Sequence, residues 1–185
     1  MNIFYLDSDP IQAAKWQCDK HIIKMPLETA QMLCTAHRCL DGFRRLKFTP
    51  KGRKVTRFEM FNKFHDALFY KATHWNHPST QWIMESDEHY RWAYEHWIAL
   101  SQEFAQRQGK AHKSWEVLAD YLLAPPSNIA SAGFSEPPTA INEEWQHLIV
   151  PDDTVQSYRN YYQVAKRHLH KWKQNQPPWL ELLEV

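Results

Sequence analysis

The sequence predicts an all-α fold, a single-domain helical bundle built around one long kinked helix. Two observations predict it: apolar residues recur at intervals of three and four over most of the chain, and no extended run has an obvious partner strand. The chain has 185 residues, and a domain of this size buries roughly two-thirds of its unfolded surface. No internal repeat or shift in composition divides residues 1–185, so we expect one domain.

Composition excludes several classes of protein. The chain has no run of ~18 apolar residues, and its start lacks the basic and apolar pattern of a signal peptide, so we expect a cytoplasmic protein without a membrane segment. The odd number of cysteines favours reduced thiols over a disulfide framework. Glycine-rich phosphate loops and the GxSxG, HExxH and CxxC motifs are absent, which removes most common enzyme signatures.

Residues 18–40 predict the central helix, which carries two chemically different faces. One face is apolar and the other is polar. The polar face places His21, Lys24 and Glu28 on successive turns, so that an imidazole, an ammonium and a carboxylate point toward one place. Pro26 would bend the helix at that turn, because it has no amide hydrogen to donate. On spacing alone, Lys24 and Glu28 are also consistent with an exposed ion pair worth ~0.3–0.5 kcal/mol. The apolar stripe consists of Ile22, Pro26, Thr29, Leu33, Ala36 and Leu40.

Before this helix, residues 2–6 predict an extended lead-in and Pro10 lies in the first turn of a short helix. After it comes a basic segment in which no acid occurs between Asp41 and Glu59, although the chain as a whole carries a net charge of only +1. We expect a flexible segment, with turns at Pro50 and Gly52, that contacts a polyanion. Its basic residues are Arg44, Arg45, Lys47, Lys51, Arg53, Lys54 and Arg57.

The rest of the chain predicts further helices over 58–73, 80–108, 114–123 and 152–173. The longest, 80–108, has one stripe that we assign to the core and a second that contains Trp82 and His89, whose burial the pattern leaves open. A proline- and serine-rich loop over 127–138 is long for a compact domain and therefore either functional or mobile. The core stripe consists of Tyr90, Tyr94, Trp97, Ser101 and Phe104.

One motif in the central helix resembles a known family. The sequence DKHIIKMPLE places Asp19, His21 and Glu28 as in the pyrimidine-dimer DNA glycosylases of the phage endonuclease V type, where the catalytic glutamate follows the histidine by seven residues. The chain also resembles a broader set of short bacterial and phage proteins grouped with that family. Lys24 and Glu28 match the lysine and glutamate of their helix, and 76–78 matches a later Asn-His-Pro.

The resemblance implies an all-helical DNA N-glycosylase with abasic-site lyase activity on a damaged or modified base, and no metal or other cofactor. Such enzymes use an amine that attacks the sugar C1′, and the family uses its N-terminal amine, because α-amines titrate near ~8 whereas lysine titrates near ~10.4. Here Met1 or Lys24 would supply the amine. Glu28 would act in acid-base catalysis, and His21 would orient the sugar or a phosphate.

The implied partner is duplex DNA with one base extruded from the stack and placed near Trp75, Asn76 and His77. The basic segment would hold the DNA backbone through contacts that weaken with salt. Two other hypotheses remain open on the sequence. One is a non-catalytic nucleic-acid-binding module. The other is a metal-dependent hydrolase in which His74 and His77 bind zinc together with His65 or His89. The sequence leaves the oligomeric state open.

Overall fold

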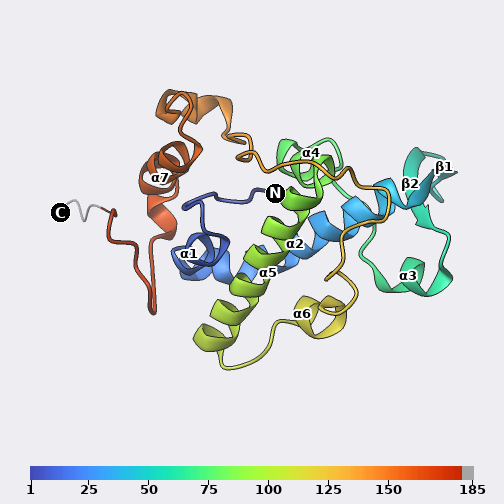
Figure 1. Ribbon diagram of the computed structural model, residues 1–185, viewed down its shortest axis with the longest axis horizontal. Coiled ribbons are helices and arrows are strands. Elements are labelled where there is room, and N and C mark those ends of the chain that lie inside the picture. Colours follow the sequence, from blue (N-terminus) through green and yellow to red (C-terminus); the bar gives the residue numbers. More distant parts are fainter. Residues whose placement is uncertain (181–185) are drawn as a thin grey trace.

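The computed structural model describes residues 1–180, which form a mostly helical fold with one small β-hairpin (Figure 1). The prediction of an all-α fold is therefore right for most of the chain and wrong for the hairpin. No helix in this part of the chain is long and apolar enough to cross a membrane. In chain order the elements are α1 (Pro10–Lys15), α2 (Asp19–Leu40), β1 (Gly42–Phe48), β2 (Lys54–Met60), α3 (Lys63–Leu68), α4 (Pro78–Glu85), α5 (Asp87–Gln108), α6 (Lys113–Leu118), η1 (Glu143–Leu148), α7 (Thr154–Ala165) and η2 (Arg167–Leu169).

Helix α2 lies at the centre of the fold and packs against α4, α5 and α6 (Figure 1). Its predicted extent is confirmed, since it begins at Asp19 and ends at Leu40. The apolar stripe is buried as expected, for example at Ile22 and Leu33. The polar side chains His21, Thr35 and Arg38 of this helix are also buried, because other elements cover α2 on more than one side, whereas Lys24 is exposed.

Helix α2 continues through Pro26. Two side chains from neighbouring helices donate hydrogen bonds to the Pro26 carbonyl, Trp97 Nε1 at 2.8 Å and Ser114 Oγ at 3.3 Å. Both side chains are buried, so these bonds join α5 and α6 to the middle of α2. They also give two buried donors a partner, and a buried donor left unpaired costs about 1–3 kcal/mol.

The basic segment predicted to be flexible is instead an ordered hairpin. Strands β1 and β2 pair antiparallel, with Arg45 opposite Arg57 and Phe48 opposite Lys54. The turn is closed by a hydrogen bond from Thr49 N to the carbonyl of Arg53, at 2.9 Å. Cross-strand pairing at 58–60 also explains why the predicted helix over 58–73 is wrong: the helical part is only α3, which begins at Lys63.

A tight junction joins the hairpin to α2. A Cβ at Gly42 would lie 2.5 Å from the carbonyl oxygens of both Arg38 and Glu59, so only glycine fits between helix and strand. The Arg38 side chain is 3% exposed, and its guanidinium pairs with Asp66 at 2.7 Å. This one side chain therefore fixes several turns of backbone around the hairpin. Its further acceptors are the carbonyl oxygens of Phe58, Asp66, Phe69 and Tyr70.

The helix predicted over 80–108 is divided at Ser86, which adopts an extended conformation and caps α5 by accepting a hydrogen bond from Glu88 N. The same hydroxyl donates to the carbonyl of Ala132 at 2.7 Å. The predicted core stripe of α5 is buried throughout, and Trp82 and His89 of the second stripe are buried as well.

The last predicted helix is shorter than expected, since α7 ends at Ala165 and the short helix η2 follows. Tyr158 and Tyr162 of its predicted stripe are fully buried. Helix α6 ends at Leu118, five residues before the predicted end at 123. The predicted loop is present: residues 125–142 contain no helix or strand and cross the molecule between α6 and η1 (Figure 1).

Candidate active site

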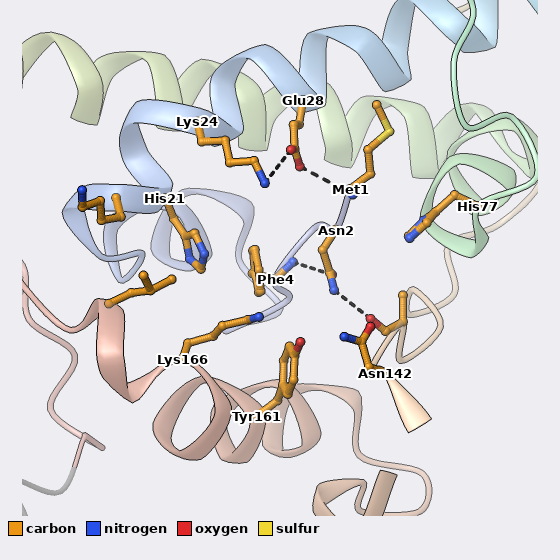
Figure 2. Close-up of a pocket in the computed structure, with 13 residues that line it drawn as sticks. Met1, Asn2, Phe4, His21, Lys24, Glu28, His77, Asn142, Tyr161 and Lys166 are labelled. Atoms are coloured by element: carbon orange, nitrogen blue, oxygen red, sulfur yellow. Dashed lines mark hydrogen bonds and ion pairs between the residues drawn. The ribbon is translucent and has the colours of Figure 1, made fainter. Parts of the chain in front are cut away.

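The first six residues form an extended segment beside α2, as the sequence predicts. The Asn2 side chain holds this segment in place, because its Nδ2 donates to the carbonyl of Ala140 at 2.8 Å and its Oδ1 accepts from Phe4 N at 3.2 Å (Figure 2). Phe4 has a left-handed backbone with φ of 53°, which costs roughly 1–2 kcal/mol for a residue with a side chain. Its ring stacks on His21 at 4.3 Å between centroids, so packing compensates for this strain.

Two nitrogen atoms lie beside the carboxylate of Glu28. The amino nitrogen of Met1 lies 3.8 Å from Oε2, and Nζ of Lys24 lies 2.8 Å from Oε1 (Figure 2). The Glu28 and Met1 side chains are 14% and 3% exposed, whereas that of Lys24 is 64% exposed. The structure thus brings together three of the predicted catalytic residues. Of the two residues that carry an amine, Met1 is the one whose side chain is shielded from solvent.

These groups line a pocket of about 500 Å³, which His21 and His77 also border. In Figure 2 these two side chains approach the pocket from opposite sides of the Met1–Glu28 pair. The lining contains three lysines and the Met1 amine but only one carboxylate, so its charge favours an anionic ligand. The remaining lining residues are Asn2, Phe4, Lys20, Lys24, Ala140, Asn142, Tyr161, Lys166 and Leu169.

His21 is neutral, and its contact with Tyr162 indicates which ring nitrogen carries the hydrogen. The Tyr162 hydroxyl accepts a hydrogen bond from Cys18 N at 2.8 Å and lies 2.7 Å from Nδ1 of His21. We assign the hydroxyl as the donor to Nδ1, because this direction gives the hydrogen of a buried hydroxyl a partner. An imidazole that accepts at Nδ1 carries its hydrogen on Nε2. Burial lowers the pKa of His21 to about 3, and the ammonium groups of Lys166 and Lys24 lower it further. His21 therefore offers the pocket a neutral N–H donor.

His77, at the start of α4, resembles His21 in that its Nδ1 accepts a hydrogen bond. Its Nδ1 accepts a hydrogen bond from Ser79 N at 3.2 Å and so caps the helix. Burial lowers the pKa of His77, and the positive amine of Met1 acts in the same direction. The predicted residue His77 thus belongs to the pocket, where its Nε2 is a second neutral donor.

The wall opposite α2 comes from the second half of the chain. Asn142 lies just before η1, and Tyr161 and Lys166 belong to α7 and its end (Figure 2). Nζ of Lys166 lies 4.8 Å from the centre of the Tyr161 ring. The sequence did not reveal these residues, because Tyr161 and Lys166 flank the buried stripe of α7 and no motif marks them.

Apart from His77, the predicted nucleic-acid-binding residues do not line the pocket of the Met1–Glu28 pair. All seven basic residues are exposed on the hairpin, beyond the end of α2. Trp75 and Asn76 do not line the pocket that His77 borders. The Trp75 ring instead contacts Phe58 of the hairpin edge-on, with 5.3 Å between ring centroids.

The metal-site hypothesis finds no support in residues 1–180. No three histidine, cysteine or acidic side chains in that range form a group that could hold a metal ion. Nδ1 of His74 is bonded to Thr73 at 2.7 Å. The ring nitrogens of His89 bind the carbonyl of Trp82 and the backbone amide of Ser135. The two histidines therefore stabilise local structure.

Fold and site together define a mostly helical protein with a cationic pocket in which an amine adjoins a carboxylate. In three comparisons, with models of protein families, with curated proteins and with solved structures, the chain shows no match.

Proposed function

We propose that this protein is a DNA N-glycosylase with abasic-site lyase activity, acting on a damaged or modified base. The observation that supports it is the pair formed by the Met1 amine and the Glu28 carboxylate, 3.8 Å apart in a pocket of about 500 Å³. An amine beside a carboxylate is the combination needed for imine chemistry at a sugar carbon. The resemblance of residues 19–28 to the pyrimidine-dimer glycosylases supports the same reaction.

The reaction begins when the free amine attacks C1′ of the target nucleotide. A bond forms between nitrogen and C1′, the bond from C1′ to the base breaks, and the base leaves with the electron pair and a proton. The bond from C1′ to O4′ then breaks, O4′ takes a proton, and an imine remains on the enzyme. Loss of a C2′ proton with rupture of the bond from C3′ to the phosphate oxygen cuts the strand, and water then hydrolyses the imine.

Glu28 is positioned to move the protons in these steps. Its carboxylate is within reach of the amine and faces the pocket, so it supplies the proton for O4′ and accepts one from the attacking nitrogen. His21 and His77 are neutral donors that hydrogen-bond to sugar or base oxygens. Lys20 and Lys166 attract the phosphates that flank the target nucleotide.

We assign the nucleophile to Met1 rather than to Lys24. Nζ of Lys24 lies directly on the carboxylate at 2.8 Å, and most of this side chain faces solvent. The Met1 amine lies beyond hydrogen-bonding distance of Glu28, at 3.8 Å, and its side chain is anchored by burial. The assignment requires a free amino group on Met1, which the mass of the intact protein and of its first peptide would check.

Borohydride trapping tests the proposal. We expect the protein, mixed with a duplex that contains one abasic site, to form a covalent adduct when borohydride reduces the imine, and peptide mapping to place the adduct on Met1. Lys24→Gln should still form the adduct, and chloride in place of borohydride should give none. Absence of any adduct from the intact protein would refute the lyase activity, and an adduct on Lys24 would overturn the assignment to Met1.

A non-catalytic nucleic-acid-binding module is the second candidate. It is favoured by the Lys24–Glu28 contact, which has the i,i+4 spacing of an ordinary ion pair on a helix surface. This function predicts that duplex DNA binds but is neither trapped nor cut, and that Glu28→Gln changes nothing. The trapping experiment therefore separates the two candidates.

A further inference from the structure

The β-hairpin β1–β2 carries a concentrated positive charge that the Met1–Glu28 pocket does not use. Seven lysine and arginine residues lie between Gly42 and Met60, with Glu59 as the one acid. Glu59 pairs with Arg45 and Lys47. Within residues 1–180, no acid lies within 4.0 Å of the other five cations, which are Arg44, Lys51, Arg53, Lys54 and Arg57.

The two faces of the hairpin differ in chemistry, because side chains alternate between faces along a strand and paired residues share a face. Arg45, Lys47, Arg57 and Glu59 lie on one face, where Glu59 compensates part of the positive charge. Leu46 and Phe48 lie on the other face, and they are 52% and 72% exposed. Beside them, this second face carries Arg44, Lys54 and Thr56.

Large exposed apolar side chains beside unpaired cations suit a polyanion that has apolar edges. Duplex DNA has this character: phosphates line the groove and the bases form its floor. The major groove is about 12 Å wide and admits a two-stranded β-ribbon, whose strands lie about 4.8 Å apart. Seven cations against one acid make a phosphate-rich partner the best match.

The hairpin also has a fixed position relative to the pocket. Glu28 and Leu40 belong to the same helix, and twelve residues at about 1.5 Å each separate them by about 18 Å. Arg38 and Gly42 hold the hairpin to the end of that helix. In Figure 1 the hairpin lies at one end of the molecule, well beyond the N-terminus. A duplex that touches both sites spans at least about five base pairs at 3.4 Å per step.

We propose that the hairpin is a second DNA-binding element that lies in the major groove, with Arg44, Leu46, Phe48 and Lys54 facing the DNA, at least about five base pairs from the target nucleotide. The arginine and lysine contact phosphates, and Leu46 and Phe48 contact base edges such as thymine methyl groups. This inference rests on the proposed function for the identity of the partner, duplex DNA. It goes beyond that function by assigning a groove, a face of the hairpin and a distance.

Binding to an undamaged duplex of 30 base pairs tests the hairpin separately from catalysis. We expect the double variant Leu46→Ser/Phe48→Ser to bind at least about tenfold more weakly, and Arg44→Gln/Lys54→Gln to reduce the salt dependence by about 0.9 per cation removed. The matched controls are Leu123→Ser, which removes another exposed leucine, and Lys113→Gln, which removes another exposed cation. Both should bind as the unmodified protein does.

Chemical protection on a duplex with one abasic site tests the groove. We expect protection of guanine N7, which faces the major groove, at five or more base pairs from the site. Protection only of adenine N3, in the minor groove, would overturn the assignment, as would hairpin variants that bind like the controls. Sedimentation showing a dimer that dissociates in Leu46→Ser/Phe48→Ser would instead identify the face as a contact between two copies.

The outcomes separate this inference from the proposed function. Hairpin-dependent binding to undamaged DNA without any borohydride adduct would refute the lyase and leave the hairpin proposal standing. Trapping and strand cleavage that are unaffected by the hairpin variants would refute the hairpin proposal and leave the lyase standing. An intact protein that binds no duplex at all would refute both.

Discussion

The hydroxyl of Tyr162 lies 2.7 Å from Nδ1 of His21 and accepts a hydrogen bond from the backbone amide of Cys18, and we assign the hydroxyl hydrogen to the histidine because it then has a partner. A single buried tyrosine on α7 thereby sets which nitrogen of a histidine on α2 carries a hydrogen. The contact joins residues 141 positions apart in the chain. It explains how His21 presents an N–H group, rather than a lone pair, to the pocket.

Tyr162→Phe should release this tautomer. We expect nitrogen NMR of the imidazole to change from a pure Nε2–H form to a mixture, with a loss of about 1–3 kcal/mol in stability because Nδ1 of His21 and the amide of Cys18 lose their partner. Tyr158→Phe is the matched control, since its buried hydroxyl bonds to Ala140 N and to the carbonyl of Pro138 and makes no bond to His21. An unchanged His21 spectrum in Tyr162→Phe would contradict the assignment.

Glu28→Gln should abolish chemistry with little effect on stability. The substitution keeps shape and hydrogen bonding but removes the charge and the exchangeable proton, and a positioned acid-base group supplies ~10²–10⁴-fold in rate. We expect base release and strand cleavage to fall by that factor, while DNA affinity is retained and stability changes by ~1 kcal/mol or less. Glu116→Gln, which removes a different ion pair within a helix, the i,i+3 pair with Lys113, is the control. Full activity in Glu28→Gln would exclude the proposed role.

Stability should fall as the solution is acidified from pH 6.5 toward pH 4. Burial lowers the pKa of His21 to about 3 and the pKa values of His37 and His96 to about 4. Below pH 6.5 the unfolded chain binds protons at these sites while the folded chain does not. Acidification therefore stabilises the unfolded state relative to the folded state. Each histidine contributes a slope of up to about 1.4 kcal/mol per pH unit. Urea unfolding at several pH values would measure it, and His96→Gln should flatten the slope by one proton.

Arg38→Met should loosen the hairpin. The variant keeps the apolar stem but removes every donor, so Asp66 and four backbone carbonyls lose their partner, and we expect a loss of about 3 kcal/mol or more. Hydrogen exchange should show faster exchange of the amides of β1 and β2. Arg91→Met removes an arginine that is 54% exposed and serves as the control. Unchanged exchange in the hairpin of Arg38→Met would show that other contacts hold it.

Local sequence patterns predicted the parts of the fold that depend on local periodicity. The bounds of α2 and the buried stripe of α5 follow from apolar spacing and from stop signals such as Asp41-Gly42. The hairpin was missed because its strands carry charges where a strand pattern would place apolar residues. Its pairing also depends on Arg38, which lies outside both strands. The break at Ser86 was missed because the helical periodicity resumes immediately after it.

The candidate site was predictable only as far as it lies on one helix. His21, Lys24 and Glu28 share a face of α2, so their spacing alone brings them together. The approach of Met1 depends on the left-handed turn at Phe4, and the far wall of the pocket depends on how α7 docks. These are contacts between distant segments, and no spacing within one element indicates them.

The junction at Gly42 has an evolutionary consequence. Any side chain at this position would collide with two backbone carbonyls. Only glycine is therefore tolerated at position 42, even where the charges and the length of the hairpin change during evolution. Homologues that keep the hairpin should therefore retain Gly42 together with Arg38, whereas those that lose the hairpin should lose both. The two residues would then be kept or lost together, and a sequence that contains both would identify a relative that carries the β1–β2 hairpin.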